Sequence, residues 1–204
     1  MFNIKFKGIY KNEEQLIKNS KLPKNAIQFE EENSESEAFK KGLIFAIPII
    51  IIMIAVFIII SKLRNVEFKY SIIHLIITSF IPILALYIHE IIHALTFPFK
   101  YEKEIYSNPK QMSLFVYCDK TVSKVRFIMI CLMPTIILAF LPYIISLIIT
   151  KINIYLSIDL LIISVVMTLS AVGDFTNVYN TLRQVPKKVL IFNYGYHSFW
   201  IKNK

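Results

Sequence analysis

The feature that most constrains this chain is a run of 18 residues without a charged side chain, from Leu43 to Ile60. About 18 or more apolar residues in a helix are enough to cross the hydrocarbon core of a bilayer. Hydrophobic residues make up 55% of the 204 positions, which exceeds the roughly 45–50% typical of soluble domains. The sequence therefore predicts an all-α polytopic membrane protein with about four transmembrane helices.

The expected spans are separated by short polar segments. They cover about residues 43–60, 71–97, 125–149 and 152–179. Together they form one expected membrane-embedded domain, residues 42–180. A tail of residues 181–204 follows and is expected to be cytosolic or interfacial.

Residues 1–41 read as a small α+β segment. FNIKFKGIY alternates apolar and polar residues, which predicts a half-buried strand, and NEEQLIKNS is typical of a short helix. A second extended stretch, AIQF, precedes the acidic residues 30–37, which we expect to form a solvated linker. Because these polar residues precede the first apolar run, we expect no secretory signal peptide and a cytosolic N-terminus.

The distribution of basic residues predicts the orientation in the membrane. With both termini inside, 19 of the 23 Lys and Arg residues fall on the cytosolic side and 4 on the other side, as the positive-inside rule requires. The net charge of +9 is therefore explained by topology, with the lipid bilayer as partner and no nucleic acid. The expected location is a bacterial cytoplasmic membrane. Cys118 and Cys131 have no metal-site or disulfide spacing and read as small apolar residues.

The second span contains the sequence HEIIH, from His89 to His93. Residues four apart lie on one face of a helix, so both imidazoles can bind one metal ion. Glu90 lies beside them and can act as the general base, taking a proton from water and returning it to a leaving amine. Zinc suits such donors, although the same set also accepts cobalt, manganese or iron. The alternative is that both histidines are hydrogen-bonded between helices and Glu90 pairs with a lysine such as Lys100.

A catalytic zinc site needs a third protein ligand. Asp174 is the best candidate, because it ends a long apolar run and has the same predicted depth as the motif; Gly173 before it is expected to allow close approach. Asp174 could instead be a helix-terminal carboxylate that is hydrogen-bonded to nearby amides or paired with Arg183. The other candidates are Glu102, Glu104, Asp119 and His197.

Three motifs carry a resemblance to a known family: HEIIHAL, SAVGDFTN and VPKKVLIFNYG. Over roughly residues 70–200 the chain resembles small bacterial membrane proteins called "putative zincin peptidases", and it is more distantly similar to the site-2 protease clan of intramembrane metalloproteases. The resemblance implies His89, His93 and Asp174 as zinc ligands and Glu90 as base. Gly173 before the aspartate and Phe175 after it depart from the site-2 pattern.

Other polar residues have weaker interpretations. Asn177 lies three positions after Asp174 and could donate to a substrate carbonyl or oxyanion, or could simply end a helix at the membrane surface. His74 lies 15 residues before His89, about 22 Å along a helix at 1.5 Å per residue, so it is expected to be interfacial.

The loop of residues 98–124 contains an apolar run, MSLFVYC. This run could form an edge strand that pairs with a protein or peptide substrate, or a β-hairpin that only closes the site. The sequence therefore favours a zinc endopeptidase acting at the cytosolic side of the membrane. A non-catalytic protein that keeps the scaffold for partner binding, or a metal transporter, remains as an alternative.

Overall fold

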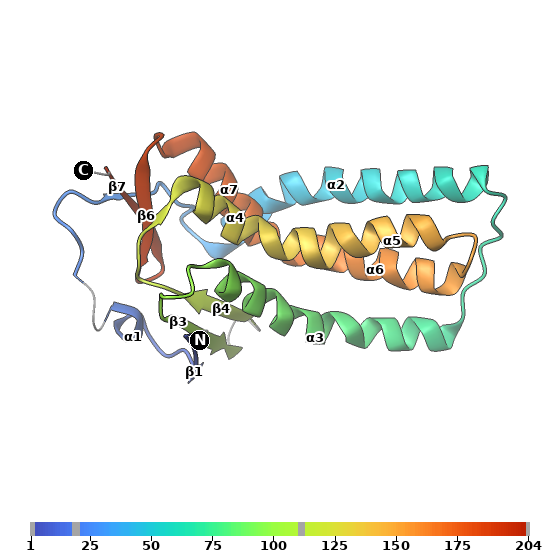
Figure 1. Cartoon of the computed structure of the whole chain (residues 1–204), viewed down its shortest axis with the longest axis horizontal. Helices are drawn as coiled ribbons and strands as arrows, with labels where there is room; N and C mark the ends of the chain where they lie inside the picture. The colour runs from blue at the N-terminus through green and yellow to red at the C-terminus, as the bar shows by residue number, and fades with distance from the viewer. Residues whose placement is uncertain (1–2, 18–20, 110–112, 203–204) are drawn as a thin grey trace. The chain divides into compact units, whose positions relative to one another are not determined.

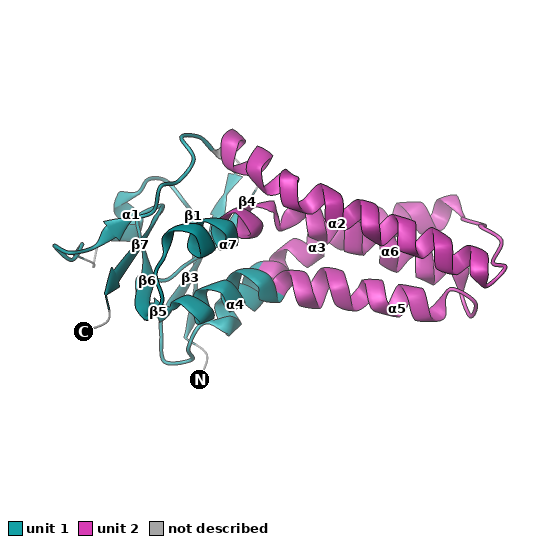
Figure 2. Ribbon diagram, turned by 90° about the horizontal axis from the view of Figure 1, so that it is seen from above, with its two compact units in different colours: residues 1–35, 90–133, 177–204 teal, residues 36–89, 134–176 magenta. Residues whose placement is uncertain are grey.

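The chain folds into two compact units, each built from separate stretches of sequence. The computed structural model describes residues 3–17, 21–109 and 113–202. Unit 1 contains residues 1–35, 90–133 and 177–204, and unit 2 contains residues 36–89 and 134–176 (Figure 2). The expected division into residues 1–41, 42–180 and 181–204 stays a prediction.

Unit 2 consists of helices. It contains α2 (Glu35–Leu63) and most of α3 (Ile72–Thr96) (Figure 1). It also contains the π-helical turn η2 (Ile136–Phe140), α5 (Leu141–Ile149) and α6 (Ile154–Ser170). Ala85, Ala139 and Met167 form its buried apolar cluster, so α3, η2 and α6 meet there through small side chains and one flexible one.

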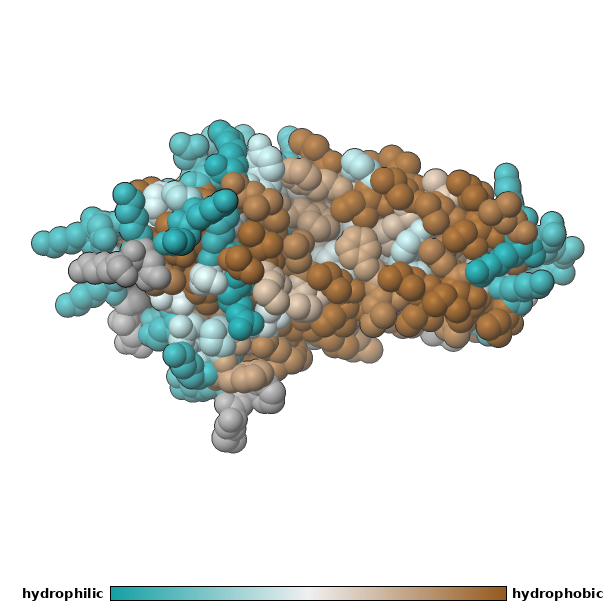
Figure 3. Space-filling view, turned by 45° about the horizontal axis from the view of Figure 1, so that its top comes forward, coloured by the Kyte–Doolittle hydropathy of each residue, from teal (hydrophilic) through white to brown (hydrophobic). Residues whose placement is uncertain are grey.

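Three helical segments are long and apolar enough to cross a membrane: Ser36–Leu63, Ile72–Thr96 and Lys124–Ile149. The third is made by α4 (Lys124–Thr135), η2 and α5, so the helix continues past Pro134 and Pro142. Figure 3 shows hydrophobic residues covering the helices of unit 2, with hydrophilic residues gathered where α2 joins α3 and where α5 joins α6. These three segments match three of the four expected spans.

The fourth expected span, residues 152–179, is not one straight helix. The chain bends by 50° between α6 and α7 (Val172–Gln184), and this bent pair is a fourth candidate span only if it is counted as one. Ala171 lies at the break between the two helices. The bend starts a new helix just before Asp174.

Unit 1 contains two small sheets. In the first, β1 (Ile4–Ile9) pairs in parallel with β3 (Lys103–Asn108), which pairs antiparallel with β4 (Ser113–Tyr117). The second has the order β2 (Ile27–Gln28), β7 (His197–Lys202), β6 (Val189–Tyr194) and β5 (Val122–Ser123), all antiparallel. The predicted hairpin in the 98–124 loop is confirmed, and α1 (Glu14–Ile17) matches the predicted short helix.

The C-terminal tail forms a hairpin that the sequence analysis did not foresee. Tyr194 pairs with His197, so Gly195 and Tyr196 make the turn. Gly195 has φ of +61°, which L residues rarely adopt, and a Cβ there would collide with the Glu13 side chain. The backbone N–H of Tyr196 donates to Glu13 Oε1 at 3.1 Å, which joins the turn to the N-terminal segment.

One prediction for the N-terminal segment is wrong, and another is incomplete. β1 is not half-buried, because Phe6 is 72% exposed and Ile9 58% exposed at the edge of its sheet. Most described residues of the acidic stretch 30–37 are exposed, as expected, but two of its glutamates also have partners in unit 1. Glu31 accepts from the Ser198 backbone at 2.8 Å and contacts His197, and Glu32 accepts from Asn180 at 3.3 Å. The stretch therefore connects β7 and α7 within unit 1.

Lys103 on β3 is a buried cation. Its side chain is 0% exposed, and its Nζ donates to the Pro98 carbonyl at 3.4 Å. Burial lowers the pKa of this ammonium, because the charged form loses its hydration. Burial also raises the pKa of the neighbouring Cys118 thiol to about 11, so the thiol stays neutral.

We expect Lys103→Met to stabilise unit 1 by about 1–3 kcal/mol at neutral pH, the usual cost of a poorly satisfied buried polar group. The folded pKa is below the unfolded one, so the cost is fully present below the folded pKa and declines as pH rises toward about 10.4. The unfolding temperature of Lys103→Met in detergent should therefore exceed that of the wild type, and the difference should shrink at high pH. Lys120→Met, at an exposed lysine, is the control; an equal gain there would contradict the argument.

Gly42 marks a close contact between α2 and the start of α7. A Cβ at Gly42 would lie 2.1 Å from the Val172 carbonyl oxygen, and nothing lies within 4 Å of a Cβ built at Gly173. The expectation that Gly173 allows the close approach is therefore wrong, because Gly42 does so. Thr176 strengthens the same contact by donating to the Ala38 carbonyl at 3.0 Å.

We expect Gly42→Ala to destabilise the protein by about 1–3 kcal/mol, as other overpacked contacts do. Gly173→Ala is the matched control and should be neutral or slightly stabilising, because alanine favours a helix by up to about 1 kcal/mol over glycine. The measurement is the unfolding temperature of both variants in the same detergent. Equal effects of the two substitutions would show that the helix approach does not depend on Gly42.

Candidate metal centre

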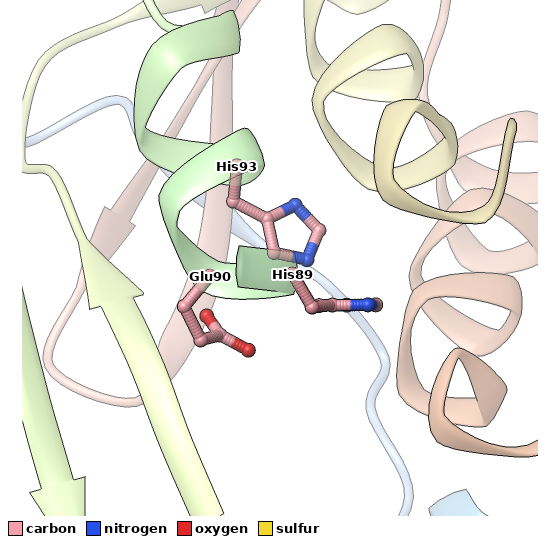
Figure 4. A group of neighbouring side chains, drawn as sticks. All are labelled: His89, Glu90 and His93. Atoms are coloured by element: carbon pink, nitrogen blue, oxygen red, sulfur yellow. The ribbon is translucent and has the colours of Figure 1, made fainter. Parts of the chain in front are cut away.

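The last turns of α3 bring three potential ligands together. His89, Glu90 and His93 offer ligand atoms that all lie within 4.8 Å of one another. Figure 4 shows the His93 imidazole turned toward the side chain of His89, with the Glu90 carboxylate beside them. The predicted convergence of the two histidines on one face of the helix is thus present.

Helix α3 ends just beyond this group. Pro98 follows two residues after Thr96, and proline is common there because it cannot continue a helix. Arg126 donates from NH1 to the Thr96 carbonyl at 3.2 Å, which satisfies one of the carbonyls left open at the helix end. These contacts fix the end of the helix that carries the motif.

His93 is oriented by a backbone carbonyl of α4. Its Nδ1 lies 2.8 Å from the Ile130 oxygen, and this hydrogen bond is buried. A carbonyl can only accept, so Nδ1 carries the proton and donates it. The lone pair of a neutral His93 is therefore on Nε2, the arrangement that a metal-binding histidine needs.

His89 contacts Asp174 within unit 2. The distance from His89 Nε2 to Asp174 Oδ2 is 3.1 Å, and both side chains are largely buried, at 5% and 13% exposure. Asp174 lies in the first turn of α7, where the helix dipole favours a negative charge. Gly42 and Thr176 hold this turn against α2, as described above, so the bend before α7 brings the carboxylate to His89.

The described cluster of His89, Glu90 and His93 could hold a metal ion. Two ligands of one tetrahedral zinc, at 2.0–2.2 Å from the metal, are about 3.3 Å apart, close to the separation of His89 Nε2 and Asp174 Oδ2. Imidazole nitrogens and a carboxylate oxygen are the donors of catalytic zinc sites. A metal could therefore replace the direct contact between His89 and Asp174 with only small side-chain shifts.

The other candidates for a third ligand have different partners. Glu102 pairs with Lys5 and Glu104 with Lys7, both at 2.8 Å. Asp119 pairs with Lys120 at 3.1 Å, and His197 contacts Glu31 at 2.6 Å. Arg183 approaches Glu30 at 4.0 Å, and the pairing of Asp174 with Arg183 stays an alternative. The role of Asp174 as a ligand stays a prediction.

Comparison with known proteins agrees with this geometry. Residues 82–190 match the family described as "Putative zincin peptidase". The chain belongs to this family. No curated protein and no solved structure gives a significant match. The family match covers α3 from Pro82, the 98–124 hairpin and both helices of the bent pair, and its description indicates a zinc-dependent metallopeptidase.

The suggested oxyanion donor remains a prediction. Asn177 is exposed on α7, three residues after Asp174, and its backbone carbonyl accepts from Thr181 at 2.7 Å. Asn180 on the same helix is buried and donates to Glu32. The Ile130 carbonyl is a feature of the site that the sequence analysis missed, because backbone atoms leave no residue signature.

A second polar cluster in unit 2 was also missed. Asp159 on α6 accepts from Tyr70 at 2.5 Å and from Thr78 at 2.6 Å, and its other oxygen lies 2.7 Å from His74 Nδ1. Tyr155 stacks on the His74 ring. His74, whose side chain is 41% exposed, is therefore part of a partly buried network, and its interfacial position stays a prediction. The signal in the sequence was a lone aspartate in an apolar segment.

We expect Asp159→Ala to destabilise the protein by about 1–3 kcal/mol, because it leaves the buried Thr78 hydroxyl and two partly exposed donors without their acceptor. Tyr70→Phe removes one of these donors and should cost about 1 kcal/mol. Unfolding temperatures in detergent measure both effects. Ser79→Ala is the control on α3, because Ser79 is exposed and its hydroxyl donates to the Leu75 carbonyl of the same helix. The cluster has no structural importance if Asp159→Ala unfolds like this control.

Proposed function

We propose that this protein is a membrane-embedded zinc metalloendopeptidase that hydrolyses peptide bonds of membrane or membrane-proximal proteins at the cytosolic side. The observation that carries the proposal is the convergence of His89, Glu90 and His93 within 4.8 Å. The Asp174 carboxylate against His89 and the family membership add support. In this proposal His89, His93 and Asp174 are the zinc ligands.

A bound zinc supplies Lewis-acid polarisation of the scissile carbonyl and lowers the pKa of a water to about 7. Glu90 accepts a proton from the attacking water and delivers it to the departing amine. Its position one residue after His89 places it on the neighbouring side of the helix, beside the ligands and not between them. Among these side chains, Glu90 is therefore the base.

The strand β4 is the proposed contact for substrate outside the helices. It pairs only with β3 in the described sheet, so its other edge has backbone groups that an extended peptide can use. Strand addition suits proteolysis, because a peptide bond in a helix has its carbonyl engaged and is shielded. A protein or peptide in extended conformation is thus the proposed substrate class.

The proposed orientation has both termini in the cytosol. Its support is the charge distribution, with 19 of 23 basic residues on that side. The HEIIH motif would then lie at the cytosolic end of α3, which runs from outside to inside. The chemistry would resemble that of site-2 proteases, in which the zinc site is also formed by membrane helices.

The test compares the wild type with Glu90→Gln, purified in detergent and also expressed in membranes of host cells. We expect both proteins to contain one zinc per chain by elemental analysis. New protein N-termini, measured by N-terminal mass spectrometry of the membranes, should appear with the wild type and fall at least 100-fold with the variant, the lower range for loss of general-base catalysis.

Other outcomes would exclude the peptidase. Equal N-termini for wild type and Glu90→Gln, with metal retained, would favour a protein that uses the zincin scaffold for binding. Zinc uptake by vesicles containing the wild type, without cleavage, would favour transport.

His93→Gln should lose zinc in addition to cleavage, which distinguishes a zinc ligand from the general base. Retention of zinc by this variant would remove His93 from the ligand set.

A further inference from the structure

We infer that Pro134 is a positioning residue for the metal centre, because it frees the Ile130 carbonyl to orient His93. In a regular α-helix, the N–H of residue 134 would donate to the carbonyl of residue 130. Proline has no N–H, and its ring also pushes that carbonyl away from the helix axis. The inference rests on the proposed function of His93 as a zinc ligand.

The structure places these groups as this argument requires. Pro134 lies inside α4, is less than 2% exposed, and is exactly four residues after Ile130. The Ile130 oxygen accepts instead from His93 Nδ1 at 2.8 Å. The hydrogen bond missing from α4 is thus replaced by one from α3. The imidazole N–H thus takes the place of the N–H that proline lacks, and a buried carbonyl keeps a partner.

The replacement selects one tautomer of His93. The Ile130 carbonyl holds the proton on Nδ1, so Nε2 is available to the metal before any metal arrives. An alanine at position 134 would supply an N–H that competes for the same oxygen. His93 would then be free to rotate or to place its proton on Nε2, where it blocks metal binding.

The first test reads the tautomer directly. Protein labelled with 15N-histidine, in micelles, free of metal and at a pH where imidazoles are neutral, gives a long-range 1H–15N spectrum that distinguishes Nδ1–H from Nε2–H. The chain has four histidines, and His93→Gln assigns the signal. We expect Nδ1–H in the wild type and loss of that pattern in Pro134→Ala. An Nε2–H pattern in the wild type would overturn the inference.

The second test measures zinc affinity by competition with a chelator. Loss of a partner of this kind weakens metal binding roughly 10- to 100-fold, and we expect a change in this range for Pro134→Ala. Pro48→Ala is the matched control, because Pro48 lies inside α2 and not inside α4. It should leave both the His93 tautomer and zinc affinity unchanged. Equal losses in both proline variants would overturn the inference.

An ester at position 134 distinguishes the effect of the missing N–H from the effect of the proline ring. Incorporation of lactic acid there gives the alanine side chain without an N–H, so the wild-type tautomer should return. Persistence of the altered tautomer in this ester would contradict the inference. The tautomer is read without metal, so it tests Pro134 even if the wild type binds no zinc, an outcome that would refute the proposed function instead.

Discussion

The structure of unit 2 depends on satisfying polar groups in an apolar interior. Each buried carboxylate is expensive unless donors surround it, and the chain satisfies two of them through one helix. Asp159 is bound by His74 of α3, and Asp174 is bound by His89 of the same helix. These contacts fix α3 against α6 and the first turn of α7, and everything proposed about the metal centre requires that arrangement.

The metal centre combines two kinds of constraint. The spacing within HEIIH is a property of one helix, so any α3 would present both histidines on one face. The orientation of those side chains comes from other elements. Ile130 fixes His93, whereas Gly42 and Thr176 hold α7 so that Asp174 reaches His89. A zincin motif in a short helical peptide would lack these contacts, so its side chains would not be held in this orientation.

The sequence predicted those features of the structure that depend on residues close together in the chain. The charge-free run gave α2, and the four-residue spacing of the histidines gave the core of the site. The apolar run after Pro109 predicted β4. Long-range features left no such trace: the pairing of β1 with β3, the use of Glu31 by β7, and the bend at Ala171 depend on tertiary partners. Gly173 misled because it precedes Asp174, the expected ligand, while the close contact was at Gly42.

The two histidine–aspartate contacts have the same separation along the chain. His74 and Asp159 are 85 residues apart, and so are His89 and Asp174. The interval of 15 residues between the two histidines is therefore matched by the interval between the two aspartates. Inserting or deleting one residue inside either interval would rotate one member of a pair by about 100° away from its partner. An insertion or deletion in one interval would have to be matched by another that restores both contacts. These two intervals should therefore vary least in length when relatives of this chain are aligned.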